Sequence, residues 1–186
     1  MQFLLESKKN ELEKMIYDGL CMLKRIEETQ RFSMDLSSNF NTFSIKALPL
    51  YRVDGEVSDF ATVEEYENVI DIIYSNNADM LSQIMRYISF DINGINGTKM
   101  IIVDAVDEKE DNGVFLQYPK CFYTVREEVQ PPKERSDLMA IMHKLSYEYA
   151  NEKGLRLLGE AFAIIRLITY KANETKSYME IFIPFE

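Results

Sequence analysis

The chain has 186 residues, 46% of them hydrophobic, which allows one substantial core and an appended helix rather than two full domains. Its net charge of -10 argues against a nucleic-acid surface, because binding to phosphates depends mainly on Lys and Arg. Cys21 and Cys121 are too far apart in the sequence to indicate a disulfide framework or metal site, and no apolar stretch approaches the ~20 residues of a membrane helix. We therefore expect a cytoplasmic protein, with DNA excluded as a direct partner of this segment.

Residues 1–31 are predicted to form a dimerisation or linker helix. Apolar side chains return there at intervals of three and four residues, as on one face of an amphipathic helix: Leu5, Leu12, Met15, Ile16, Leu20, Met22, Leu23 and Ile26. This face needs a partner, which could be the following domain or a second copy of the helix. Seven-residue steps through Leu5, Leu12, Gly19 and Ile26 favour a short coiled coil and hence a homodimer.

Residues 32–42 have the polar composition of a linker, and the body of the protein is expected to span residues 43–186. The body contains two copies of one plan, strand, helix, strand, strand, over about residues 43–106 and 114–186. The expected strands are 43–53, 86–92, 99–106, 114–128, 156–169 and 177–185, and the helices begin at the capping box Thr62–Glu65 and near Ser136. Such units predict an α+β fold in which an antiparallel sheet carries both helices on one face and leaves the other face available for function.

Four phrases of the second repeat resemble, in order and spacing, the GyrI-like effector-binding domain: 118–125, 147–155, 158–164 and 178–184. In that family two repeats frame a groove for small, often cationic or aromatic, molecules. Residues 4–13 look like the linker helix of multidrug-responsive MerR-type transcription regulators, where it pairs antiparallel in the dimer. The resemblance implies the effector-binding part of such a regulator, which would reach DNA only through a domain absent from this chain, unless it is a free-standing sensor.

The last strand gives the most specific site prediction. Alternation places Met179, Ile181 and Ile183 on a face under the helices, and Tyr178, Glu180 and Phe182 on the opposite face. A carboxylate between two aromatic rings suits a flat lipophilic cation, through charge neutralisation and cation–π attraction. The alternative is a solvated face in which Glu180 is a surface acid.

Further ligand-wall candidates follow from alternation and from the family pattern: Tyr123, Phe162, Tyr147 and Tyr87. Each could instead be an ordinary core or sheet-surface residue. The resemblance also implies a pocket glutamate and an aromatic ring at positions where this chain has Ala163 and Ile165. Glu180 is therefore expected to carry the pocket charge alone, or the ligand to be neutral and more apolar.

Catalysis has little support in the sequence. The single histidine, His143, has no Ser, Cys or acid at a spacing that suggests a triad, and no metal-ligand cluster or phosphate-binding glycine loop is present. We expect no enzyme activity, no metal and no cofactor. Two alternatives remain open: a GyrI-like hydrolase assisted by Glu180, and a module that docks on a macromolecule through its acidic surface, as gyrase inhibitors do.

Overall fold

The computed structural model describes residues 2–57, 83–109, 112–130, 138–171 and 174–186. Its elements, in chain order, are α1 (Gln2–Asn39), β1 (Ser44–Val57), β2 (Ile84–Asp91), β3 (Gly94–Ala105), β4 (Val114–Gln130), α4 (Leu138–Lys153), β5 (Glu160–Lys171) and β6 (Glu174–Pro184). The helix predicted to begin at the capping box Thr62–Glu65 lies outside the described residues. The α+β class, with a long N-terminal helix and an antiparallel sheet, is confirmed.

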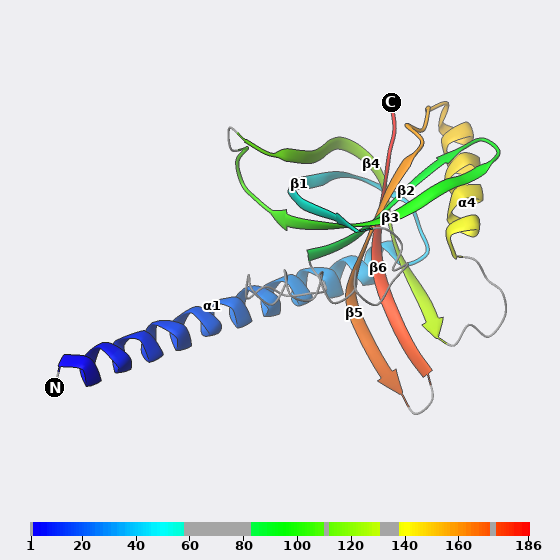
Figure 1. Cartoon of the computed structure of the whole chain (residues 1–186). Coiled ribbons are helices and arrows are strands. Elements are labelled where there is room, and N and C mark those ends of the chain that lie inside the picture. The colour runs from blue at the N-terminus through cyan, green and yellow to red at the C-terminus, as the bar shows by residue number, and fades with distance from the viewer. Residues whose placement is uncertain (1, 58–82, 110–111, 131–137, 172–173) are drawn as a thin grey trace.

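The six described strands form one sheet that closes on itself (Figure 1). The strand order is β1-β3-β2-β5-β6-β4, and β1 completes the ring because it pairs antiparallel with both β3 and β4. The sheet face that was predicted to be free for function therefore encloses an interior. Function on that face has to be performed inside the ring or at its ends.

Alternation along each strand divides the buried side chains between the two faces of the sheet. We call the enclosed set the inner core; it includes Leu48, Tyr51, Met85, Val103, Tyr123, Val125, Phe162, Ile164 and Phe182. The opposite face packs against α4, and we call this set the helix-side core; it includes Ile88, Phe90, Phe122, Met142, Ala161, Ala163, Met179, Ile181 and Ile183. The predicted division of the last strand into two faces is thus observed.

The end of α4 follows the sequence signal closely. The helix ends at Lys153, and Gly154 adopts a φ of 66°, a left-handed conformation that glycine reaches without the steric cost of a Cβ. The next strand begins at Glu160 rather than at residue 156 as predicted. Between them, Arg156 pairs with Glu186 through two backbone hydrogen bonds, so this connection is tied to the C-terminus of the chain.

The predicted linker at residues 32–42 is mostly helical, which corrects the sequence interpretation. Helix α1 continues to Asn39 because Phe32, 3% exposed, and Leu36 on the next turn pack against the inner core. Tertiary packing of this kind commonly outweighs a polar local composition. The last third of α1 therefore belongs to the globular body.

The remainder of α1 extends away from the sheet (Figure 1). Its apolar face is exposed to solvent along this length: Leu5, Leu12, Met15, Ile16, Leu20, Leu23 and Ile26 are each more than half exposed. Neither α1 nor α4 has the length and apolar content needed to cross a membrane, within the part of the chain that the structure describes. The amphipathic pattern of the sequence is thus present as a helix whose apolar face has no cover from the sheet.

Candidate ligand-binding site

The carboxylate of Glu180 lies inside the ring and is bonded on both of its oxygens. Strand β6 places it between β4 and β5, where the residue is only 8% exposed. The hydroxyl of Tyr123 donates to Oε1 at 2.7 Å, and Nε of Arg166 donates to Oε2 at 2.5 Å. A second guanidinium nitrogen of Arg166 donates to the hydroxyl oxygen of Tyr51 at 3.1 Å. These four side chains form one polar network, which we call the Glu180 network.

Electrostatics keep Arg166, Tyr123 and Tyr51 each in a single protonation state at neutral pH. Burial by itself would lower the pKa of Arg166. The Glu180 carboxylate and the Tyr51 hydroxyl outweigh burial, so the pKa of Arg166 is raised. Burial, followed by the Glu180 charge, raises the pKa of Tyr123 well above its ordinary value. Burial likewise raises the pKa of Tyr51. The guanidinium is therefore charged, both phenols are neutral, and the carboxylate is balanced by one cation.

Aromatic rings continue from this network along the inner core. Phe182 lies 4.9 Å from Tyr123 between ring centroids, and the ladder places Phe182 directly opposite Phe162. Phe162 in turn lies 5.6 Å from Tyr87 and 5.5 Å from Tyr118. Tilted pairs at these separations are favourable beyond the area they bury. These rings line the inner face from Glu180 on β6 toward the start of β5.

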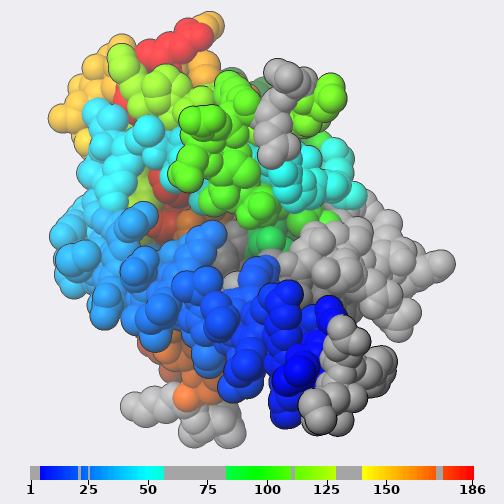
Figure 2. Space-filling view, turned by 90° about the vertical axis from the view of Figure 1, so that its left-hand side faces the viewer, coloured from blue at the N-terminus to red at the C-terminus, as the bar shows by residue number. Residues whose placement is uncertain are grey.

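The docked end of α1 borders the same network. Asp35 on α1 forms an ion pair with Lys46 at 2.5 Å, and the Lys46 ammonium lies 4.1 Å from the centroid of the Tyr123 ring. Phe32 packs against the inner core one turn earlier. Figure 2 shows a hollow beside the blue helix, through which deeper atoms of the C-terminal strands (red and orange) are visible. Residues of α1 thus contact the side chains that surround Glu180.

Six of the seven predicted site residues lie together on the inner face: Glu180, Tyr178, Phe182, Tyr123, Phe162 and Tyr87. Tyr147 does not, and its assignment to this wall is wrong. Its ring packs 6.0 Å from Phe90 and 4.9 Å from His143, in the helix-side core. The reason is that α4 covers the outer face of the sheet, so that its described buried side chains, such as Met142 and Ala150, belong to the helix-side core.

Glu180 is not the lone charge that the sequence suggested, because Arg166 neutralises it. Ala163 and Ile165, where the family resemblance implied an acid and a ring, face the helix-side core rather than Glu180. Alternation through Phe162, Ile164 and Arg166 could have placed the arginine on the inner face, given the ladder pairing of Ile164 with Glu180. The pattern of the last strand alone does not reveal this partner, because Arg166 lies on the neighbouring strand.

Two side chains that could assist hydrolysis have other partners in the structure. Both Glu180 oxygens accept hydrogen bonds, from Tyr123 and from Arg166, which hold this carboxylate in place. His143 is on the other side of the sheet, where Nε2 lies 2.6 Å from the Asp91 carbonyl oxygen. In the described parts of the chain, no three His, Cys, Asp or Glu side chains are placed to hold a metal ion.

No family model matches the chain, and a search of curated proteins finds no match. Among solved structures, the C-terminal domain of EcmrR is similar, at 16% identity and a TM-score of 0.44, over 78% of this chain and 97% of that one. SAV2435 bound to tetraphenylphosphonium is similar at 12% identity and a TM-score of 0.37, over 77% and 93%. A hydrolase encoded by lin2189 from Listeria innocua is similar at 11% identity and a TM-score of 0.44, over 84% and 98%.

Proposed function

We propose that the chain is a small-molecule-sensing domain that binds a hydrophobic or cationic aromatic effector inside the ring, next to the Glu180 network. In this proposal it serves a bacterial transcription regulator whose DNA-binding domain is not in the chain. The proposal is carried by the surroundings of Glu180. This residue is buried, both of its oxygens accept hydrogen bonds, and it lies in an aromatic interior that contacts the docked end of α1. The GyrI-like resemblance of the sequence gives additional support.

The chemistry of the interior determines which effectors suit it. Around Glu180 the protein supplies its own cation, Arg166, so the aromatic wall formed by Phe162 and Phe182 suits a neutral, flat ligand body. A cation placed against Glu180 itself would have to displace Arg166 and leave a guanidinium buried without its partner, which is costly. The groups that recognise a ligand charge are therefore expected away from Glu180.

Binding would be transmitted through contacts of α1. Phe32 and the Asp35–Lys46 ion pair join the helix to the inner core, and Lys46 also covers the ring of Tyr123. A ligand that moves Tyr123 or Phe162 changes the surface on which α1 is docked. Such a ligand shifts the position of α1 only by its difference in affinity for the two states.

The test replaces one ring on each side of the sheet. Phe162→Leu should weaken binding of flat aromatic compounds by about tenfold, because it removes the central stacking surface of the inner wall. Tyr147→Leu is the matched control, since it removes a ring from the helix-side core only. Affinities would be measured by isothermal titration calorimetry, well below the unfolding temperature of both variants. Equal losses in the two variants, or no binding to the unaltered protein, would contradict the proposal.

We also propose that the exposed part of α1 pairs with a second copy. Leu12, Ile16 and Leu20 are each more than half exposed and lie on successive turns of the helix. Ile16→Glu combined with Leu20→Glu should convert a dimer into a monomer in sedimentation equilibrium, because pairing would bury four new carboxylates per dimer at an apolar seam. Lys24→Glu, which changes an exposed charge of α1, should leave the mass unchanged. A monomeric unaltered protein would rule out this pairing.

A further inference from the structure

Glu160 is a second carboxylate on the inner face, at the first residue of β5, whereas Arg166 lies in the middle of that strand. The inward side chains of this strand include Glu160, Phe162, Ile164 and Arg166. Because Ile164 pairs with Glu180 in the ladder, Glu160 lies four residues from the level of Glu180, or about 13 Å along the strand. The two carboxylates are far enough apart to be altered independently.

Aromatic side chains surround Glu160 on the sheet. The hydroxyl of Tyr118 donates to its Oε1 at 3.1 Å, and Tyr87 and Tyr118 both lie against the ring of Phe162. Burial and the Glu160 charge raise the pKa of Tyr118 to about 12, and the same two causes raise the pKa of Tyr87. Both phenols are therefore neutral donors at physiological pH. Glu160, Tyr87 and Tyr118 are each partly exposed, so a ligand can reach them from solvent.

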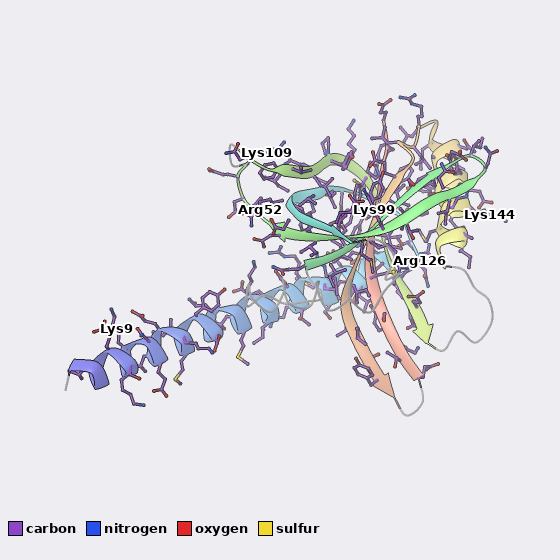
Figure 3. All side chains as sticks on the ribbon, in the orientation of Figure 1. Lys9, Arg52, Lys99, Lys109, Arg126 and Lys144 are labelled. Carbon is purple, nitrogen blue, oxygen red and sulfur yellow. The ribbon has the colours of Figure 1, made fainter. Side chains whose placement is uncertain are left out.

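The charge balance at Glu160 differs from that at Glu180. Among the residues that the structure describes, no Lys or Arg forms an ion pair with Glu160, whereas Glu180 is paired with Arg166. The nearby Lys99, labelled in Figure 3, extends over the Tyr87 ring at 5.2 Å from its centroid and forms its ion pair with Glu56 at 2.8 Å. Glu160 is therefore an acid that lies among aromatic rings, and its described hydrogen bond is with the neutral phenol of Tyr118.

We propose that Glu160, with Tyr87 and Tyr118, is the part of the site that recognises a positive charge on an aromatic ligand. The cationic group would lie against the Glu160 carboxylate and the partly exposed rings of the two tyrosines. The aromatic body would enter toward Phe162 by separating the side chains that bury this ring, which is 0% exposed. An ammonium or heteroaromatic cation gains from both the carboxylate and the ring faces in this position. The inference rests on the proposed function, and it assigns recognition of the ligand's positive charge to Glu160 rather than to Glu180.

The test uses two compounds of one shape, N-methylquinolinium and its neutral isostere α-methylnaphthalene. Calorimetric titration of the full chain should show a preference for the cation of roughly tenfold. Glu160→Gln should reduce that preference to about twofold or less and leave the affinity for α-methylnaphthalene nearly unchanged. Glu160→Lys should reverse the preference, because it places a like charge beside the ligand.

Matched variants separate this inference from the proposed function. Glu152→Gln removes an exposed carboxylate from α4 and should retain the full preference for the cation. The inference is overturned if Glu160→Gln keeps the preference, if Glu180→Gln or Glu152→Gln abolishes it, or if the unaltered protein binds both compounds equally well. In those three cases the proposed aromatic site still stands. Failure of both compounds to bind the unaltered protein would instead reject the proposed function.

Discussion

Replacement of Arg166 by methionine should lower the free energy of unfolding by about 3–5 kcal/mol, the largest effect that we expect from a single side chain of the site. The substitution leaves the Glu180 carboxylate buried without its cation, since the Glu180 side chain is only 11% exposed. It also removes the donor to the Tyr51 hydroxyl. The measurement is equilibrium unfolding in urea at neutral pH, and unchanged stability would show that the carboxylate is not buried in this way.

A double variant identifies the cause of that loss. Arg166→Met combined with Glu180→Met replaces the whole ion pair by apolar side chains, which in other buried pairs is often close to neutral. Stability should therefore recover by most of the loss seen in Arg166→Met alone. A further decrease in the double variant would indicate that the arginine acts through packing of its aliphatic part rather than through Glu180.

Truncation of Phe32 to alanine should lower the free energy of unfolding by about 3 kcal/mol, because it removes a fully buried ring from the contact between α1 and the inner core. We also expect local detachment. Backbone amides near the end of α1, around Leu36 and Asn39, should exchange faster with solvent, while those of β6 should change only with global stability.

The matched control for this variant is Met34→Ala. Met34 is two residues away on the same helix and is 68% exposed, so its truncation should cost less than about 0.5 kcal/mol. Similar losses in the two variants would mean that α1 is not docked through Phe32. Faster exchange along all of β6 at unchanged global stability would mean that the helix also holds the sheet together.

Most of the elements could be predicted because each has a strong local signal. The strand that begins at residue 114 is predicted to end at residue 128, and β4 ends at Gln130. Helix α4 ends at Lys153, directly before the glycine that predicts its end. The hairpin between β2 and β3 was placed within Asn93–Gly97 and is tighter, with β3 starting at Gly94. The Asp91 carboxylate accepts the Asn93 amide hydrogen bond at 2.7 Å and fixes this turn.

Features that depend on long-range contacts could not be predicted from local patterns. Closure of the sheet requires β1 to pair with strands on both sides, and nothing in residues 44–57 specifies two partners. The polar composition of residues 32–42 predicts a linker, because the surface that buries Phe32 exists only after the sheet has formed. Propensity is a weak guide where tertiary packing decides.

The candidate site could be predicted only in part, because some of its contacts are local and others join distant parts of the chain. Alternation along one strand correctly placed Tyr178, Glu180 and Phe182 on one face, which is a local property of a strand. Arg166 was missed because its contact with Glu180 depends on register between two strands, and Tyr147 was misplaced because its face depends on which side of the sheet α4 covers.

A ring of hydrogen-bonded strands has a circumference set by its ladders, so a guest that widens the interior must lengthen hydrogen bonds or change the tilt of the strands. The ladders are irregular at several places, including the two steps of β1 between Lys46 and Tyr51 and the step of β5 between Ile165 and Leu167. Expansion is less costly at such positions, because fewer regular bonds are lost there. These two irregular stretches include Tyr51 and Arg166, which hydrogen-bond to each other across the interior. Widening of the ring at these positions would therefore stretch that hydrogen bond.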